Sequence, residues 1–88
     1  MLLWTDYMKY RARLREFDLE ELEKVVRFSS ERYNDEATGR QVVVGKHGDS
    51  MVLIPFETLG EDIMPVTVHR TTRQQVAARV RSGRFTHV

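Results

Sequence analysis

Hydrophobic residues recur with a helical period after residue 18 of the chain. Asp18 and Glu21 have the spacing of a capping box, in which each of the two residues satisfies a free backbone N–H at a helix start. Apolar residues at helical spacing follow: Leu19, Leu22, Val25 and Val26. The pattern predicts a helix over about 19–28.

The preceding segment, about 5–16, fits two patterns. Tyr7, Tyr10 and Leu14 would share one face of a helix, whereas basic residues that alternate with apolar ones from Lys9 to Arg15 have the period of a strand. No β-branched residue lies between Lys9 and Arg15, so we expect a helix.

A third helix is predicted near the end of the chain. Thr72 and Gln75 form a second capping box, and Val76 and Val80 follow on one face. Gly83 stands where a helix commonly ends.

Between these helices, glycines separate three strand candidates. The candidates lie at about 40–47, 51–58 and 62–69, and residues 31–33 form a possible short fourth strand. We therefore predict an α+β fold with two layers and the order α-α-β-β-β-α. An antiparallel sheet of three to four strands would be covered by two N-terminal helices and one C-terminal helix.

Three-residue loops at 48–50 and 59–61 would gather one set of apolar side chains on the covered face of the sheet. That set is Val42, Val44, Val52, Ile54, Phe56, Met64, Val66 and Val68. The open face would then carry His47, Met51 and His69 in one row across the strands. Since neighbouring strands lie ~4.8 Å apart, the two imidazoles would be about 10 Å from each other.

Composition limits the class of protein. The 88 residues make one small domain, whose core a homodimer or a partner protein would supplement. The absence of cysteine excludes disulfides and thiolate zinc sites and fits a reducing cytoplasm. The first residues become polar too soon for a signal peptide, and no apolar run approaches ~18 residues. We expect a soluble, cytoplasmic protein without a membrane partner.

Charge is divided unevenly along the chain. Residues 1–62 hold nine basic and thirteen acidic side chains, a net charge of −4. Residues 63–88 hold five arginines and no carboxylate, a net charge of +5. A region of one sign attracts polyanions, and arginine is well shaped to grip phosphate. The alternative is that these arginines form a solvated helix face.

The basic row on the predicted open face suits cleavage of an RNA backbone. That reaction needs groups that move protons and a fixed positive charge for the phosphorane, which His47, His69 and Arg73 would supply. Arg73 has an alternative role, because it falls on the helix side that should face the sheet. There it would pair with Glu57 or a backbone carbonyl. A shared metal is not expected at ~10 Å, and no cofactor motif is present.

Several short segments resemble the RelE-type toxin superfamily, and within it BrnT-like proteins and a related uncharacterised family. The segments are Thr38-Gly39-Arg40 before Val42–Gly45, Gly48 before Met51–Phe56, and PVTVHRTTRQQ at 65–75. The resemblance covers about 31–85 and matches Arg40, Arg70 and Arg73 to family arginines, with Thr67 at a small polar position. His69 departs from it by standing where the family pattern prefers arginine.

This resemblance implies a metal-independent mRNA endoribonuclease that a cognate antitoxin inhibits. RNA, including ribosome-bound mRNA, would be its substrate. Tyr33 would stack on a base or, alternatively, close the core as a half-buried aromatic. The candidate substrate-binding residues are then Tyr33, Arg40, Lys46, Thr67, Arg70 and Arg84.

Two other functions remain open from the sequence. Val43, Met51 and Leu53 on the open face would form a dimer or antitoxin patch in a non-catalytic interaction module. A nucleic-acid-binding regulator would bind duplex DNA in a salt-sensitive way.

Overall fold

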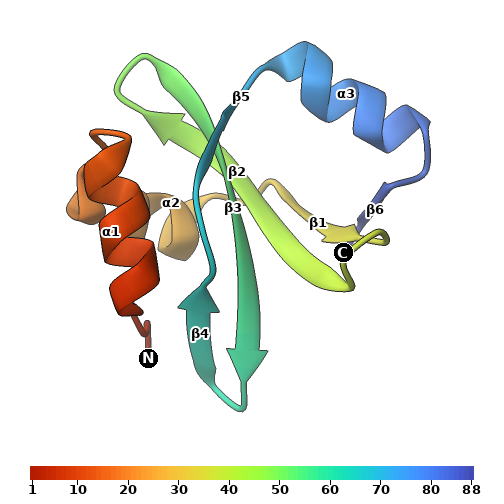
Figure 1. Ribbon diagram of the computed structural model, residues 1–88. Helices are drawn as coiled ribbons and strands as arrows, with labels where there is room; N and C mark the ends of the chain where they lie inside the picture. Colours follow the sequence, from red (N-terminus) through yellow and green to blue (C-terminus); the bar gives the residue numbers. More distant parts are fainter.

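The computed structural model describes all 88 residues as three helices and a six-stranded antiparallel sheet (Figure 1). The helices are α1 (Asp6–Leu14), α2 (Leu19–Phe28) and α3 (Arg73–Arg81). The strands are β1 (Arg32–Asp35), β2 (Arg40–His47), β3 (Ser50–Leu59), β4 (Asp62–Pro65), β5 (His69–Thr71) and β6 (Phe85–His87). The predicted α+β class and the broad order of helices and strands are confirmed.

Local capping determines where the helices start. The Asp18 side chain accepts a hydrogen bond from the Glu20 N–H at 2.8 Å, and Thr72 Oγ1 accepts one from the Gln75 N–H at 3.1 Å. Thr5 caps α1 in the same way, through the Met8 N–H. This cap gives the ambiguous N-terminal segment a helix start, as we expected.

The sheet is wider than predicted, because short strands extend both of its edges. The strand order is β4-β3-β2-β1-β6, and β5 also pairs with β3. Strands β4 and β5 thus share one edge of β3, one after the other. Phe56 of β3 pairs with Pro65 of β4, and Leu53 of β3 pairs with His69 of β5. The segment from Pro65 to His69 is therefore one residue longer than the segment of β3, from Leu53 to Phe56, that it faces. That extra residue divides the predicted strand at 62–69, as a bulge does.

The predicted register of the sheet is wrong, because both hairpin turns have two residues. His47 lies opposite Ser50, and Leu59 lies opposite Asp62. Gly48 has a φ of 59°, which suits the first central position of a tight hairpin turn. Side chains alternate between the two faces of a sheet. A register slip of one residue therefore moves each side chain of a strand to the opposite face, while the neighbouring strand keeps its own.

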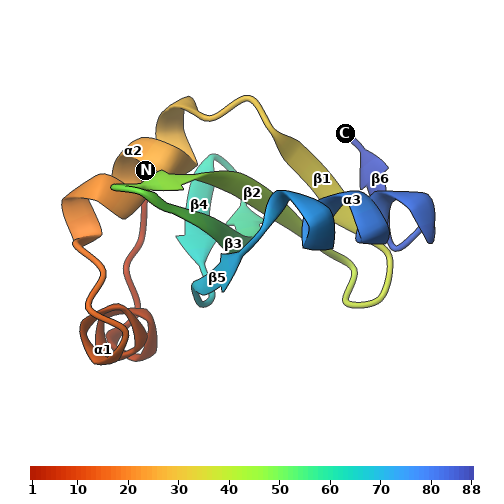
Figure 2. The ribbon, with the colours of Figure 1, turned by 90° about the horizontal axis from the view of Figure 1, so that it is seen from above.

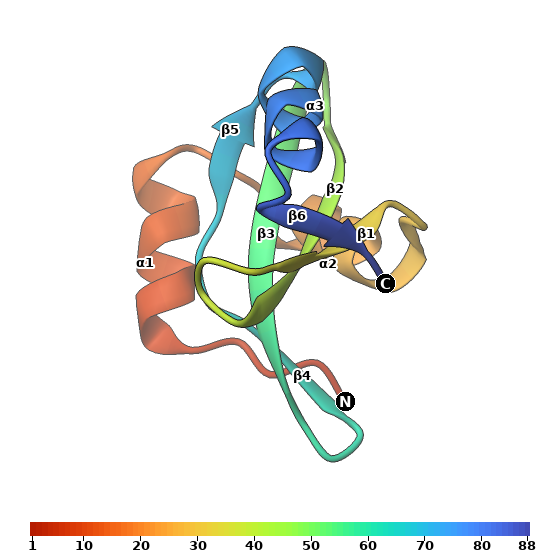
Figure 3. The ribbon, with the colours of Figure 1, turned by 90° about the vertical axis from the view of Figure 1, so that its right-hand side faces the viewer.

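Both faces of the sheet are therefore packed. On the face that we call the α2 face, helices α1 and α2 bury Val43, Val52, Ile54 and Phe56. On the opposite α3 face, Val42, Val44 and Leu53 pack with Val76 of α3. Figures 2 and 3 show α2 and α3 on different sides of the β2–β3 hairpin, so the helices do not cover one face only. Helix α1 lies beside the edge that β4 and β5 form (Figure 1).

The contact between α2 and β2 leaves no room for a side chain at Gly45. A Cβ atom there would lie 2.7 Å from Cγ1 of Val25, and Val25 is itself buried. We predict that Gly45→Ala lowers the free energy of unfolding by about 1–3 kcal/mol, because a stiff β-branched side chain would have to shift. Urea unfolding measures the loss.

A double-mutant cycle provides the control for this prediction. In a Val25→Ala background the obstructing methyl groups are gone, and Gly45→Ala should cost much less. Equal stability of the single Gly45→Ala variant and the wild type would contradict the close approach of α2 and β2.

Candidate functional site

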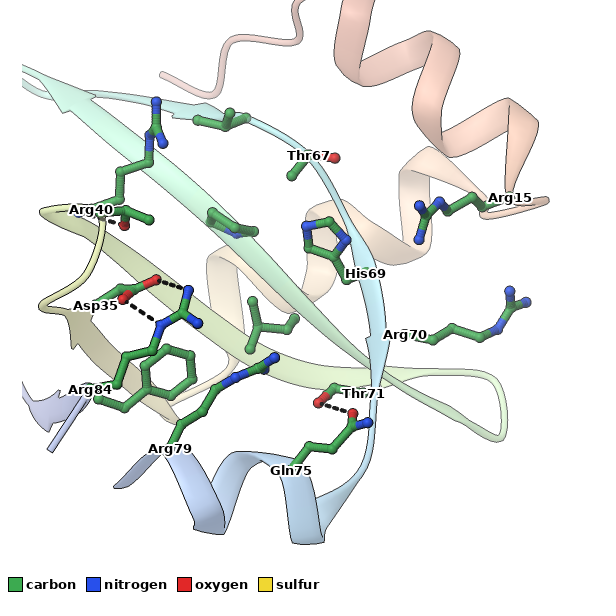
Figure 4. A pocket seen from close by; sticks show the side chains of 15 residues that line it. Arg15, Asp35, Arg40, Thr67, His69, Arg70, Thr71, Gln75, Arg79 and Arg84 are labelled. Carbon is green, nitrogen blue, oxygen red and sulfur yellow. Dashed lines mark hydrogen bonds and ion pairs between the residues drawn. The ribbon is translucent and has the colours of Figure 1, made fainter. Parts of the chain in front are cut away.

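A cleft of about 460 Å³ opens on the α3 face of the sheet (Figure 4). The end of α1, the β1–β2 turn, the bulged segment before β5, and α3 with the residues after it surround it. Fifteen residues line the cleft, and Asp35 is their only carboxylate. Five of the fifteen are arginines: Arg15, Arg40, Arg70, Arg79 and Arg84.

Asp35 holds Arg84 against one wall of the cleft. The two side chains form a bidentate pair, with Nε–Oδ1 at 3.0 Å and Nη2–Oδ2 at 3.1 Å. Asp35 is only 5% exposed and also accepts a hydrogen bond from the Ala37 N–H. The hydrogen bonds from Arg84 keep the pKa of Asp35 below its usual value although burial opposes this shift. The Arg84 side chain is therefore fixed in position, and the carboxylate of Asp35 balances most of its positive charge.

The other four arginines differ in how far their charge is balanced. Arg40 forms a half-exposed ion pair with Glu57, with Nε–Oε1 at 3.0 Å. Arg15, Arg70 and Arg79 form no ion pair. Instead, the guanidinium of Arg70 lies 4.7 Å from the centre of the Phe17 ring, and that of Arg79 lies 5.6 Å from the centre of the Phe85 ring. The Arg70 guanidinium points away from the cleft (Figure 4), so the two arginine charges that lack a carboxylate partner and point into the cleft are those of Arg15 and Arg79.

His69 occupies the middle of this basic surface. It lies in β5 opposite Leu53, and its imidazole points into the cleft, toward which Arg15 also points (Figure 4). Partial burial lowers the pKa of His69 below 6.5, and the charges of Arg15, Arg11 and Arg79 lower it further. Both effects favour the neutral form of the imidazole, which can accept a proton.

The bulge before β5 adds a polar side chain to the wall of the cleft. Val66 and Thr67 are consecutive, yet both line the cleft, because the extra residue interrupts the alternation of the strand. The Oγ1 atom of Thr67 is buried and has no hydrogen-bond partner.

The prediction that both histidines share one sheet face is wrong. His47 lies on the α2 face, where its ring contacts the edge of Phe17 at a centroid distance of 5.1 Å. Its Nε2 accepts a hydrogen bond from the Asp18 N–H at 2.8 Å. The two-residue turn places His47 there, and it connects the hairpin to the start of α2.

Three further predicted site residues lie outside the cleft. Arg73 is 59% exposed and forms a bidentate pair with Glu31, so neither its expected orientation toward the sheet nor its pairing with Glu57 is found. Tyr33 is buried, stacks on Phe85 and donates a hydrogen bond to Glu31, which is its expected structural alternative. Lys46 is exposed near the turn between β2 and β3 and does not line the cleft.

The structure brings five predicted residues together around the cleft. They are Arg40, Thr67, His69, Arg70 and Arg84. Sequence reasoning missed the roles of Arg15 and Arg79 and the Asp35 pairing. Arg79 did belong to the carboxylate-free region, which was a usable signal, whereas nothing in the sequence connected Arg15 with the cleft.

The apolar patch of the predicted interaction module does not exist on the surface. Val43 and Leu53 are both buried, and they lie on opposite faces of the sheet. The register correction explains this outcome, since neither face is left open beside these residues.

Comparisons with family models, curated proteins and solved structures find no match for this chain. No group of three or more His, Asp or Glu side chains is arranged to bind a metal ion. None of the three helices combines the length and the apolar character needed to cross a membrane.

The lowered pKa of His69 gives a first test of the cleft's electrostatics. We predict that an NMR titration of its ring protons has a midpoint below 6.5, and that Arg79→Gln or Arg15→Gln moves the midpoint up. Between the lowered pKa and 6.5 the unfolded chain binds more protons. His69 therefore makes stability fall as pH drops through this window.

Arg81→Gln is the matched control, because Arg81 is exposed on the same helix and does not line the cleft. An unchanged midpoint in the Arg79 and Arg15 variants would contradict the proximity of these charges to His69.

Proposed function

We propose that this protein binds single RNA strands through the cleft and cleaves them without a metal ion, as a toxin-type endoribonuclease related to the RelE superfamily and BrnT-like proteins. The observation that carries the proposal is a half-buried histidine with a lowered pKa, beside Arg15 and Arg79, two arginines that have no carboxylate partner. Arginine charges attract the phosphate and stabilise the charge that develops on it. A neutral imidazole is the proton acceptor that a ribose hydroxyl needs.

The proposed reaction uses one histidine. His69 accepts the proton of the 2′-hydroxyl, and the 2′-oxygen forms a bond to phosphorus. The bond from phosphorus to the 5′-oxygen breaks, and the departing oxygen takes a proton from water. The products are a 2′,3′-cyclic phosphate and a 5′-hydroxyl, and His69 returns its proton to solvent. Arg79 and Arg15 would stabilise the phosphorane. His47 and Arg73, which lie elsewhere, have no part in it.

An inhibitory partner fits the same surface. A cognate antitoxin that inserts carboxylates among the unpaired arginines would compete with RNA for the cleft and block it. Cytoplasmic location and action on ribosome-bound mRNA belong to this proposal as well.

The proposal predicts cleavage of single-stranded RNA in the presence of a metal chelator. His69→Ala should slow cleavage by about 10²- to 10⁴-fold, since a positioned base contributes that much. Arg79→Ala should slow it by about 10²-fold, through loss of charge stabilisation. A 2′-deoxy substitution at one linkage should protect that linkage. Gel analysis of end-labelled RNA measures all four results.

Arg81→Ala is the matched control and should cleave at the wild-type rate. Intact RNA in every condition, translating ribosomes included, would contradict the enzymatic proposal. Cleavage by the His69→Ala variant at the wild-type rate would exclude His69 as the base.

A further inference from the structure

Helix α1 exposes an aromatic stripe that the packing of the fold does not require. Tyr7, Tyr10 and Leu14 are 57%, 57% and 58% exposed, and their spacing places them on one helix face. The core contact of α1 is made by another face, through the buried Met8 and Ala12. The stripe is therefore free to bind something outside the chain.

This aromatic stripe adjoins the basic cleft. Arg11 follows Tyr7 by one helical turn and lies over its ring, with Cζ 5.9 Å from the ring centre. Arg15 follows Arg11 by another turn and reaches the cleft, where it points toward His69 (Figure 4). From Tyr7 to Arg15 the axial rise is about 12 Å, so Arg11 and Arg15 connect Tyr7 with the cleft over about two helical turns.

The charges of α1 indicate what the stripe would bind. Four basic residues, namely Lys9, Arg11, Arg13 and Arg15, stand between and beside the aromatic residues. Asp6 is the only carboxylate of the helix. Aromatic rings set among cations are the usual platform for unpaired bases, because the rings stack on bases while the cations follow the backbone.

We propose that Tyr7 and Tyr10 form a stacking platform for unpaired bases of a single RNA strand whose phosphate lies in the His69 cleft. This inference rests on the proposed function and deepens it by assigning the surface that holds the unpaired bases. A duplex cannot present base faces to the platform, so single strands are preferred. The tyrosines act in binding and do not touch the reacting phosphate.

Binding is measured with the whole protein and 2′-O-methyl oligonucleotides, which lack the nucleophilic hydroxyl and so stay intact. Fluorescence anisotropy compares a single strand, an abasic strand with the same backbone, and a duplex. The wild type should bind the single strand about tenfold more tightly than the abasic strand. A Tyr7→Ala, Tyr10→Ala double variant should lose that difference and bind the abasic strand as the wild type does.

Matched variants separate stacking from general effects. Tyr7→Phe with Tyr10→Phe keeps both rings and should bind as the wild type does. Phe28→Ala removes an aromatic ring that is 79% exposed on α2 and should change nothing. Equal wild-type affinity for base-containing and abasic strands would overturn the platform and leave the cleft proposal standing. No salt-sensitive binding of any oligonucleotide would overturn both.

Discussion

The two-residue turn at 48–49 determines what each face of the sheet carries. It pairs His47 with Ser50, and from there the alternation of the strands assigns every side chain of the β2–β3 hairpin to a face. Val43 and Val52 come to lie under α2, and Val44 and Leu53 come to lie on the α3 face. One more residue in this turn would exchange the faces of β2 and break both hydrophobic clusters. The cleft exists because the α3 face is only partly covered.

Long-range ion pairs connect the two differently charged parts of the chain. Arg73 and Arg84, both in the basic C-terminal region, form ion pairs with Glu31 and Asp35, both in the acidic part of the chain. These pairs lie at the β1 end of the sheet, where β6 also pairs with β1. Burial lowers the pKa of His69, and the charges of the unpaired Arg15 and Arg79 lower it further. The charge asymmetry of the sequence thus becomes an asymmetry of the folded surface.

Local signals were sufficient to predict the helices and the existence of the longer strands. Caps at Asp18 and Thr72 act within one turn of their own residue, so the sequence pattern contains them. Local signals could not predict the strand register, because the residues around Gly48 are compatible with a loop of two residues or of three residues. Strand β6 has only three residues and forms because β1 offers it an edge. Its pairing is a tertiary effect.

The same distinction applies to the candidate site. Residues close together in the chain, such as Thr67, His69 and Arg70, were predicted together and do line one cleft. The predicted position of His47 was wrong because the length of the turn determines which face its side chain lies on. The predicted position of Arg73 was wrong because its side chain forms an ion pair with Glu31 outside the cleft. Arg15 reaches the cleft from α1, and only the packing of that helix beside the β4–β5 edge makes this possible.

Chemical-shift mapping by NMR tests most directly whether the α3-face cleft is the RNA site. A labelled protein is titrated with a short 2′-O-methyl RNA strand that it cannot cleave. We predict that the largest shifts occur at residues 67–71, at Arg79 and at Arg84, and that the ring of His47 is unaffected. Shifts centred on Lys46, His47 and α2, with the cleft residues unchanged, would contradict it.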